Sequence, residues 1–89
     1  MQFTYNPAKS AANKVKHGID FGEAQRLWED DVLEIPSQYQ GEPRALLIGH
    51  IEGKYWTAVV TRRDEAIRIL SCRRSRTEEV SWYEKRKSY

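Results

Sequence analysis

Three strand-like segments of this chain are separated by turns of only two residues, and this spacing constrains the fold more than any other feature. The segments cover residues 44–51, 54–63 and 66–74. In the middle segment, Tyr55, Thr57 and Val59 alternate with Trp56, Ala58 and Val60, as side chains do on the two faces of a strand. Strands joined by two-residue turns can pair only as antiparallel neighbours. The sequence therefore predicts a meander built from these three segments.

Helix signals lie before and after the meander. Asn6 is followed by a proline, which favours a helix start, because asparagine caps free backbone amides and proline fits the first helical position. The spacing of Asp20 and Glu23 is that of a capping box and predicts a second helix. Ser75 and Glu78 predict a third helix in the same way. Two helices thus precede the strands and one follows them.

The expected fold class is α+β, with two N-terminal helices, an antiparallel meander sheet of three to four strands and a C-terminal helix. The additional strand would cover residues 32–35 and end at Pro36, before a polar loop over residues 37–42. With 89 residues, of which 39% are hydrophobic, the chain has material for one core, so a single domain over residues 1–89 is expected.

Targeting and redox signals are also informative. The longest apolar runs are much shorter than the roughly 20 residues of a membrane span, and the first residues lack the pattern of a secretory signal. We therefore expect a cytoplasmic protein without a membrane partner. The single cysteine, Cys72, has no partner for a disulfide and lacks the spacing of a zinc site, so we interpret it as a small strand residue.

Positive charge is concentrated near the C-terminus. Residues 1–60 carry six basic and eight acidic side chains, whereas residues 61–89 carry nine basic and five acidic ones. Arginine dominates the second set, and its planar fork of donors suits phosphate groups. The sequence therefore predicts a polyanionic partner. The arginines of this region are Arg62, Arg63, Arg68, Arg73, Arg74, Arg76 and Arg86.

A two-residue turn between the last two strands would set their register. Arg63 would then lie opposite Ala66, and Thr61 would lie opposite Arg68, so these side chains would share one face. Continued alternation predicts that Arg74 joins this basic face. The opposite, more apolar face would hold the other arginines of these strands, Arg62 and Arg73. In the alternative interpretation, all of them are ordinary solvated charges.

Three stretches of the chain follow, in order and spacing, the pattern of a known family. The first is the segment 3–9, followed by Asn13, Lys16, His17, Gly18 and Phe21. The second is Glu42 and Arg44 before Ile48 and Gly49. The third consists of Val59, Val60, Thr61, Arg63, Arg68, Ile69, Ser71, Arg73, Arg74, Glu79, Tyr83 and Glu84. Together they resemble the BrnT family, the ribonuclease half of type II toxin–antitoxin pairs.

This resemblance implies a RelE-like fold and metal-independent cleavage of RNA, in which the 2′-hydroxyl attacks the neighbouring phosphate. It implies no cofactor. The implied partners are the RNA substrate and a BrnA-type ribbon-helix-helix antitoxin, with operator DNA contacted only through that antitoxin. We assign catalysis to Arg63, Arg68, Arg73, Arg74, Tyr83 and His50. We assign RNA binding to Arg44, Arg62 and Arg76.

Several alternatives stay open at this level. For proton transfer the candidates are His17, His50, Glu79 and Tyr83, and the sequence does not choose among them. Two other functions would use the same basic face. A non-catalytic nucleic-acid-binding module would bind in a salt-dependent manner without cleavage, and a partner-binding module would use its cations to bind an acidic protein segment.

Overall fold

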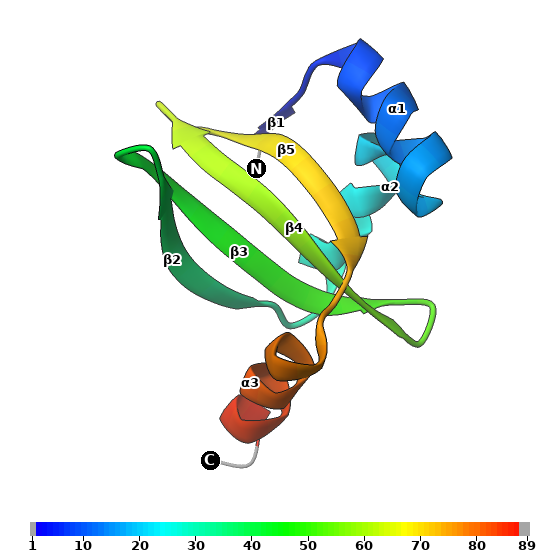
Figure 1. The fold of residues 1–89 in the computed structure, drawn as a ribbon, viewed down its shortest axis with the longest axis vertical. Helices are drawn as coiled ribbons and strands as arrows, with labels where there is room; N and C mark the ends of the chain where they lie inside the picture. Colours follow the sequence, from blue (N-terminus) through cyan, green and yellow to red (C-terminus); the bar gives the residue numbers. More distant parts are fainter. Residues whose placement is uncertain (1, 88–89) are drawn as a thin grey trace.

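A five-stranded mixed sheet forms the centre of the computed structural model, which describes residues 2–87 (Figure 1). The elements, in chain order, are β1 (Gln2–Thr4), α1 (Pro7–His17), α2 (Phe21–Ala24), the 3-10 helix η1 (Gln25–Glu29), β2 (Leu33–Tyr39), β3 (Glu42–Ile51), β4 (Lys54–Arg63), β5 (Ala66–Arg74) and α3 (Thr77–Lys87). Across the sheet the strand order is β1-β5-β4-β3-β2. Residues 1, 88 and 89, which the predicted domain includes, lie outside the described part.

The predicted fold class is wrong in its sheet. A short strand at the N-terminus, β1, pairs in parallel with β5, so the sheet has five strands and is mixed instead of a purely antiparallel meander of three to four. In addition, β2 continues through Pro36 to Tyr39 and forms a hairpin with β3 where a loop was expected. Proline is tolerated there because β2 is an edge strand.

The prediction of two N-terminal helices is also wrong in part, because α2 is a single turn of four residues that continues as η1. Its capping box is confirmed, with Asp20 accepting from the Glu23 amide and Glu23 bonding back to the Asp20 amide. The Asn6 cap of α1 is confirmed as well, since its Oδ1 accepts from two backbone amides. Local signals therefore predicted where these helices begin, but not how long α2 is.

The turns between β3, β4 and β5 have the predicted two residues. Glu52 and Gly53 both have positive φ angles, of 52° and 77°, which is the conformation that matches the twist of a tight hairpin. At the next turn Asp64 also has a positive φ, of 55°. The observed bounds of β4 and β5 equal the predicted ones.

One face of the sheet packs against α1, α2 and η1 and forms the apolar core. Its buried members are Ile19, Phe21, Ala24, Leu27, Ala45, Leu47, Ile51, Ala58, Val60, Ile67, Ile69 and Cys72. The other face carries α3 at one end, as Figure 1 shows, and we call it the α3 face. Within the described residues, no helix is long and apolar enough to span a membrane.

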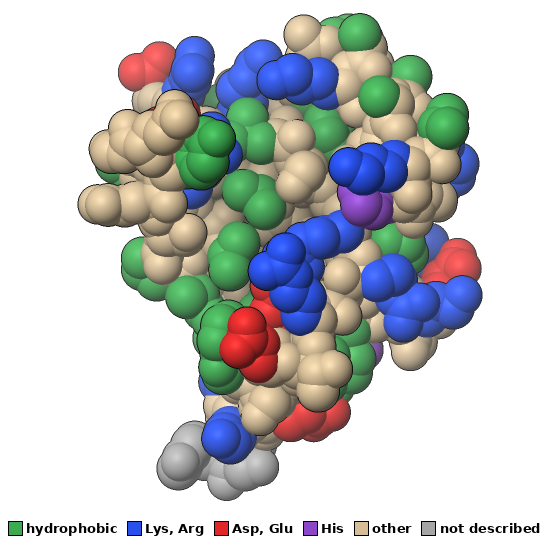
Figure 2. All heavy atoms as spheres, in the orientation of Figure 1, with side chains coloured by type: hydrophobic (Ala, Val, Ile, Leu, Met, Phe, Trp, Pro, Cys, Tyr) green, Lys and Arg blue, Asp and Glu red, His purple; other side chains and the backbone are tan. Residues whose placement is uncertain are grey.

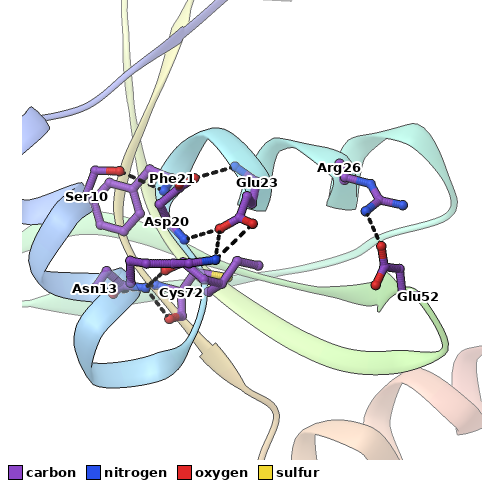
Figure 3. A network of polar contacts seen from close by, with 10 residues as sticks. Ser10, Asn13, Asp20, Phe21, Glu23, Arg26, Glu52 and Cys72 are labelled. Carbon is purple, nitrogen blue, oxygen red and sulfur yellow. Dashed lines mark hydrogen bonds and ion pairs between the residues drawn. The ribbon is translucent and has the colours of Figure 1, made fainter.

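Helix α1 turns its polar side inward. Ser10 accepts a hydrogen bond from the Phe21 amide at 2.9 Å, and Asn13 donates to the carbonyls of Ile19 and Cys72, both at 2.8 Å (Figure 3). The Cys72 amide donates back to Asn13 at 3.4 Å. Val15, in contrast, is 89% exposed. The asparagine of the Asn-x-x-Lys-His-Gly motif therefore connects α1 to β5.

Candidate nucleic-acid interface

A bulge in β5 decides which arginines reach the α3 face. The predicted pairs are confirmed, with Arg63 opposite Ala66 and Thr61 opposite Arg68. The register then shifts between Val59 and Val60, because β5 contains one extra residue at position 70. A bulge of this kind reverses the alternation beyond it and redirects side chains.

The predicted faces of two arginines are wrong as a result. Arg73 pairs with Thr57 and lies on the α3 face, whereas Arg74 pairs with Trp56 and lies on the opposite face. The Arg74 guanidinium carbon is 5.5 Å from the centre of the Trp56 ring, and its Nε donates to the Tyr55 carbonyl at 3.1 Å. The α3 face therefore holds Arg63, Arg68 and Arg73, without Arg74.

Arg73 is held by a buried carboxylate. Its two terminal nitrogens donate to the two oxygens of Glu79, at 2.8 and 2.9 Å. Glu79 is 2% exposed and also accepts from the Thr57 hydroxyl at 3.0 Å and from the Arg76 amide at 2.8 Å. This last bond places the carboxylate at the start of α3, one residue later than the predicted box of Ser75 and Glu78.

These contacts fix the charge of Glu79. Burial disfavours the charged carboxylate, but the hydrogen bonds from Arg73, the Arg76 amide and Thr57 outweigh it and lower the pKa of Glu79 to about 2. The hydrogen bond between Arg73 and Glu79 in turn raises the pKa of Arg73. At neutral pH the pair is fully ionised, so Glu79 is poorly suited to take up a proton.

A row of side chains crosses the uncovered end of the α3 face. Thr61 on β4 lies opposite Arg68 on β5. Its hydroxyl donates at 3.1 Å to the carbonyl of Pro43, the residue that precedes Arg44 on β3. Neighbouring strands are about 4.8 Å apart, so Arg44 and Arg68 lie roughly two strand spacings from each other. Arg63 follows two residues beyond Thr61 on the same face.

Some of these cations have no acidic partner. Among residues 2–86, no ion pair is found for Arg63, Arg68 or Arg76, whereas Arg44 pairs with Glu42 at 3.2 Å. In Figure 2, which keeps the orientation of Figure 1, Lys and Arg side chains lie around hydrophobic side chains on the visible face of the molecule. Unpaired arginines beside an open surface can bind an anion without first breaking a salt bridge.

Arg62 lies apart from this group. It points to the opposite face of β4, where its guanidinium forms a two-bonded pair with Glu34 on β2, with one contact of 2.8 Å. The hydrogen bond to Glu34 raises the pKa of Arg62, and the same bond lowers the pKa of Glu34. Its ion pair therefore has a structural role in joining β2 to β4.

Three aromatic rings meet under α3. The ring centre of His50 is 4.1 Å from that of Tyr55 and 5.2 Å from that of Tyr83. Tyr83 is 1% exposed, and its hydroxyl donates to the Asp31 carbonyl at 3.3 Å. His50 is partly exposed, and its position beside Tyr83 brings together two predicted site residues. His17, another candidate, is the last residue of α1, before the left-handed Gly18. Because α1 packs against the core face of the sheet, His17 does not belong to this cluster.

Tyr55 belongs to this cluster although the sequence did not single it out. Its hydroxyl donates to Glu84 of α3, and this hydrogen bond to a carboxylate raises the pKa of Tyr55 to about 12. The only sequence signal was its place in an alternating strand, which does not distinguish a site residue from a surface residue. Tyr55 therefore stays protonated at neutral pH.

The described part of the chain has no cluster of side chains suited to binding a metal ion, and its one cysteine is not reactive. Residues 2–87 contain no cluster of three or more His, Cys, Asp or Glu side chains that could hold a metal ion. Burial raises the pKa of Cys72 to about 12, so its sulfur is a neutral thiol at physiological pH. The side chains that this region offers to a ligand are thus mainly guanidinium, hydroxyl and aromatic groups.

A comparison with protein-family models gives a match over most of the chain. The family model described as the ribonuclease toxin BrnT of type II toxin–antitoxin systems matches residues 5–79. A search of curated proteins finds no match.

Proposed function

Because the chain belongs to the BrnT family of ribonuclease toxins from type II toxin–antitoxin systems, we propose that it cleaves RNA on the uncovered part of the α3 face. The family match confirms the resemblance seen in the sequence, and it implies an RNA target and an antitoxin partner. The observation that carries the proposal is the position of Arg63 and Arg68 on the α3 face, where Arg63 is exposed and Arg68 half-buried and neither has an ion pair within the described residues.

In the proposed reaction the RNA supplies its own nucleophile. A 2′-hydroxyl attacks the adjacent phosphorus, the bond to the 5′-oxygen breaks, and the products end in a 2′,3′-cyclic phosphate and a 5′-hydroxyl. No metal ion is needed if cations of the protein stabilise the charge that develops on the phosphoryl oxygens. We assign this role to Arg68 and Arg73, with Arg63, Arg44 and Arg76 binding neighbouring phosphates.

Arg73 suits transition-state stabilisation because its orientation is already fixed. Two hydrogen bonds to Glu79 hold the guanidinium plane, so little reorganisation is required when charge develops nearby. Arg68 supplies the complementary property, a guanidinium whose donors are not committed to a carboxylate within residues 2–86. Together they give one preorganised and one available cation on β5.

The aromatic cluster lies too far from Arg68 to take part in proton transfer there. His50 is six residues from Arg44 along β3, roughly 20 Å, and Arg44 lies in line with Thr61 and Arg68 across the sheet. A general base must be within hydrogen-bond reach of the proton that it takes. The pKa of Glu79, at about 2, makes that carboxylate a weak base as well. We therefore expect His50→Gln to keep both RNA affinity and a cleavage rate close to that of the parent protein.

The partner is proposed to be a BrnA-type ribbon-helix-helix antitoxin, and contact with operator DNA is proposed to occur only through it. The family supports the existence of an antitoxin, and the proposed antitoxin type follows from the resemblance of the sequence motifs. Co-expression with a BrnA-type protein, followed by purification of the pair, tests this assignment. Recovery of the chain alone under those conditions would contradict it.

Product analysis tests the proposed reaction. The purified chain is incubated in EDTA with an RNA oligonucleotide and with copies that carry a 2′-deoxynucleotide at the cleaved position. We expect cleavage of the RNA to a cyclic phosphate and no cleavage at the deoxy position. Cleavage that requires a divalent ion, or that persists at the deoxy position, would refute the mechanism. Salt-dependent binding without any cleavage would indicate a non-catalytic module instead.

A further inference from the structure

An aromatic ring lies exposed at the hairpin between β2 and β3. Tyr39 is the last residue of β2 and is 56% exposed. Along β2, it alternates with Ile35 and Ser37, which pair with Leu46 and Arg44, so it lies on the α3 face. An exposed tyrosine on a basic surface differs from an isolated surface aromatic, because nucleobases stack on such rings.

Arg44 holds this ring from one side. Its guanidinium carbon is 4.7 Å from the centre of the Tyr39 ring, in the geometry of a cation–π contact. Arg44 is itself held by Glu42, at 3.2 Å, and its side chain is only 25% exposed. One side of the ring is therefore occupied by Arg44, and more than half of the residue's surface stays in solvent.

The arrangement carries a cost for the folded state. The Nε of Arg44 is buried and has no hydrogen-bond partner among the described residues. A buried donor without an acceptor destabilises a protein, and a more exposed Arg44 would avoid this cost. The cost is explained if the position of Arg44 serves to orient Tyr39.

The ring lies next to the row of cations described above. Ser37, two residues before Tyr39, pairs with Arg44, and the row continues across the sheet through Thr61 to Arg68. A strand of RNA whose phosphates contact this row would bring its bases within reach of the hairpin. Phosphate contacts and base stacking are the two elements of single-strand binding.

We propose that Tyr39 is a stacking platform for one nucleobase of single-stranded RNA and that Arg44 is the residue that positions its ring. This proposal rests on the proposed function, because it assigns a binding subsite for the RNA that is cleaved. Stacking on a ring reads little of the base identity. The platform therefore contributes affinity and register along the strand without a strict sequence requirement.

The test uses a fluorescent 2′-O-methyl RNA oligonucleotide, which lacks a free 2′-hydroxyl and stays intact during the measurement. Binding is followed by fluorescence anisotropy at several salt concentrations. We expect Tyr39→Ala to weaken binding about fivefold to a hundredfold, the usual effect of removing one stacking ring, with an unchanged salt dependence. Tyr39→Phe should bind within about twofold of the parent protein, because the ring is kept. Trp82→Ala, which removes an exposed aromatic from α3, is the matched control and should leave binding unchanged.

Two further measurements separate stacking from a general effect on the surface. Oligonucleotides with a single abasic position are compared one position at a time. At one position, base removal should weaken binding to the parent protein but not to Tyr39→Ala. Arg44→Lys keeps the charge and loses the flat guanidinium, so it should weaken binding while the salt dependence stays the same.

The outcomes distinguish this inference from the proposed function. If the parent protein cleaves RNA but Tyr39→Ala binds the probe equally well, or shows the same abasic penalties as the parent, the platform is refuted and the nuclease proposal stands. If the platform is found in binding but the parent protein cleaves no RNA, the nuclease proposal fails and the subsite is that of a binding module.

Discussion

The guanidinium of Arg73 and the carboxylate of Glu79 face each other in parallel, with two hydrogen bonds of 2.8 and 2.9 Å between β5 and α3. This contact depends on the bulge in β5, which turns Arg73 toward the α3 face. It attaches α3 to the sheet and fixes the plane of one arginine. The Arg73–Glu79 pair therefore contributes both to the stability of the fold and to the proposed chemistry.

The pair makes stability depend on acid. The pKa of Glu79 is lowered from 4.5 to about 2 in the folded protein, so its contribution is present above pH 4.5 and is lost as the pH falls toward about 2. This contribution amounts to about 3 kcal/mol. We predict that Glu79→Gln lowers the free energy of unfolding by about this amount at pH 7, and that the difference from the parent protein shrinks below pH 4.5. Urea unfolding at several pH values measures it. A difference that does not change with pH would contradict the assignment.

The asparagine of the Asn-x-x-Lys-His-Gly motif is predicted to act on stability. Asn13→Ala would leave the carbonyls of Ile19 and Cys72 without their donor in a buried region, which should cost about 2–3 kcal/mol. Lys16→Ala, from the exposed side of the same motif, should change stability by less than about 0.5 kcal/mol. Thermal or urea unfolding compares the two. Equal effects would show that the motif has some other role.

Sequence reasoning predicted those features that depend on neighbouring residues. The Asn6 cap, the capping box of Asp20, and the bounds of β4 and β5 are determined by local backbone chemistry and by alternation, which can be seen in a single sequence. The hairpin of β2 and β3 was missed because Pro36 is a strand breaker in most positions, and only its place at the sheet edge makes it compatible.

Features that depend on distant contacts could not be predicted. The three residues of β1 form a strand only because β5 offers its edge. A one-residue bulge has no local signal, and it was enough to exchange the faces of Arg73 and Arg74. The same holds for the candidate site. The sequence indicated the arginines, but the contact of Tyr39 with Arg44 and the hydrogen bond of Tyr55 to Glu84 form only in the folded chain.

Tyr55 provides a prediction at alkaline pH. Its hydrogen bond to Glu84 raises its pKa to about 12, so Tyr55 should remain protonated at about pH 11 while an ordinary tyrosine, with a pKa of about 10, is mostly ionised. Glu84→Gln should allow one additional phenolate to form at that pH. Ultraviolet absorbance counts the phenolates, and circular dichroism verifies that both proteins stay folded. An unchanged count in Glu84→Gln would show that the carboxylate does not control Tyr55.

The central claim is that arginines on the α3 face, and not the basic charge as a whole, carry RNA cleavage. Arg68→Ala and Arg62→Ala remove the same charge from opposite faces of the sheet, and Arg62 is already paired with Glu34. The decisive measurement is the cleavage rate of RNA in EDTA by the chain purified free of any partner. We predict a loss of about a hundredfold or more in Arg68→Ala and a rate close to that of the parent protein in Arg62→Ala. Equal rates in the two folded variants would contradict the claim.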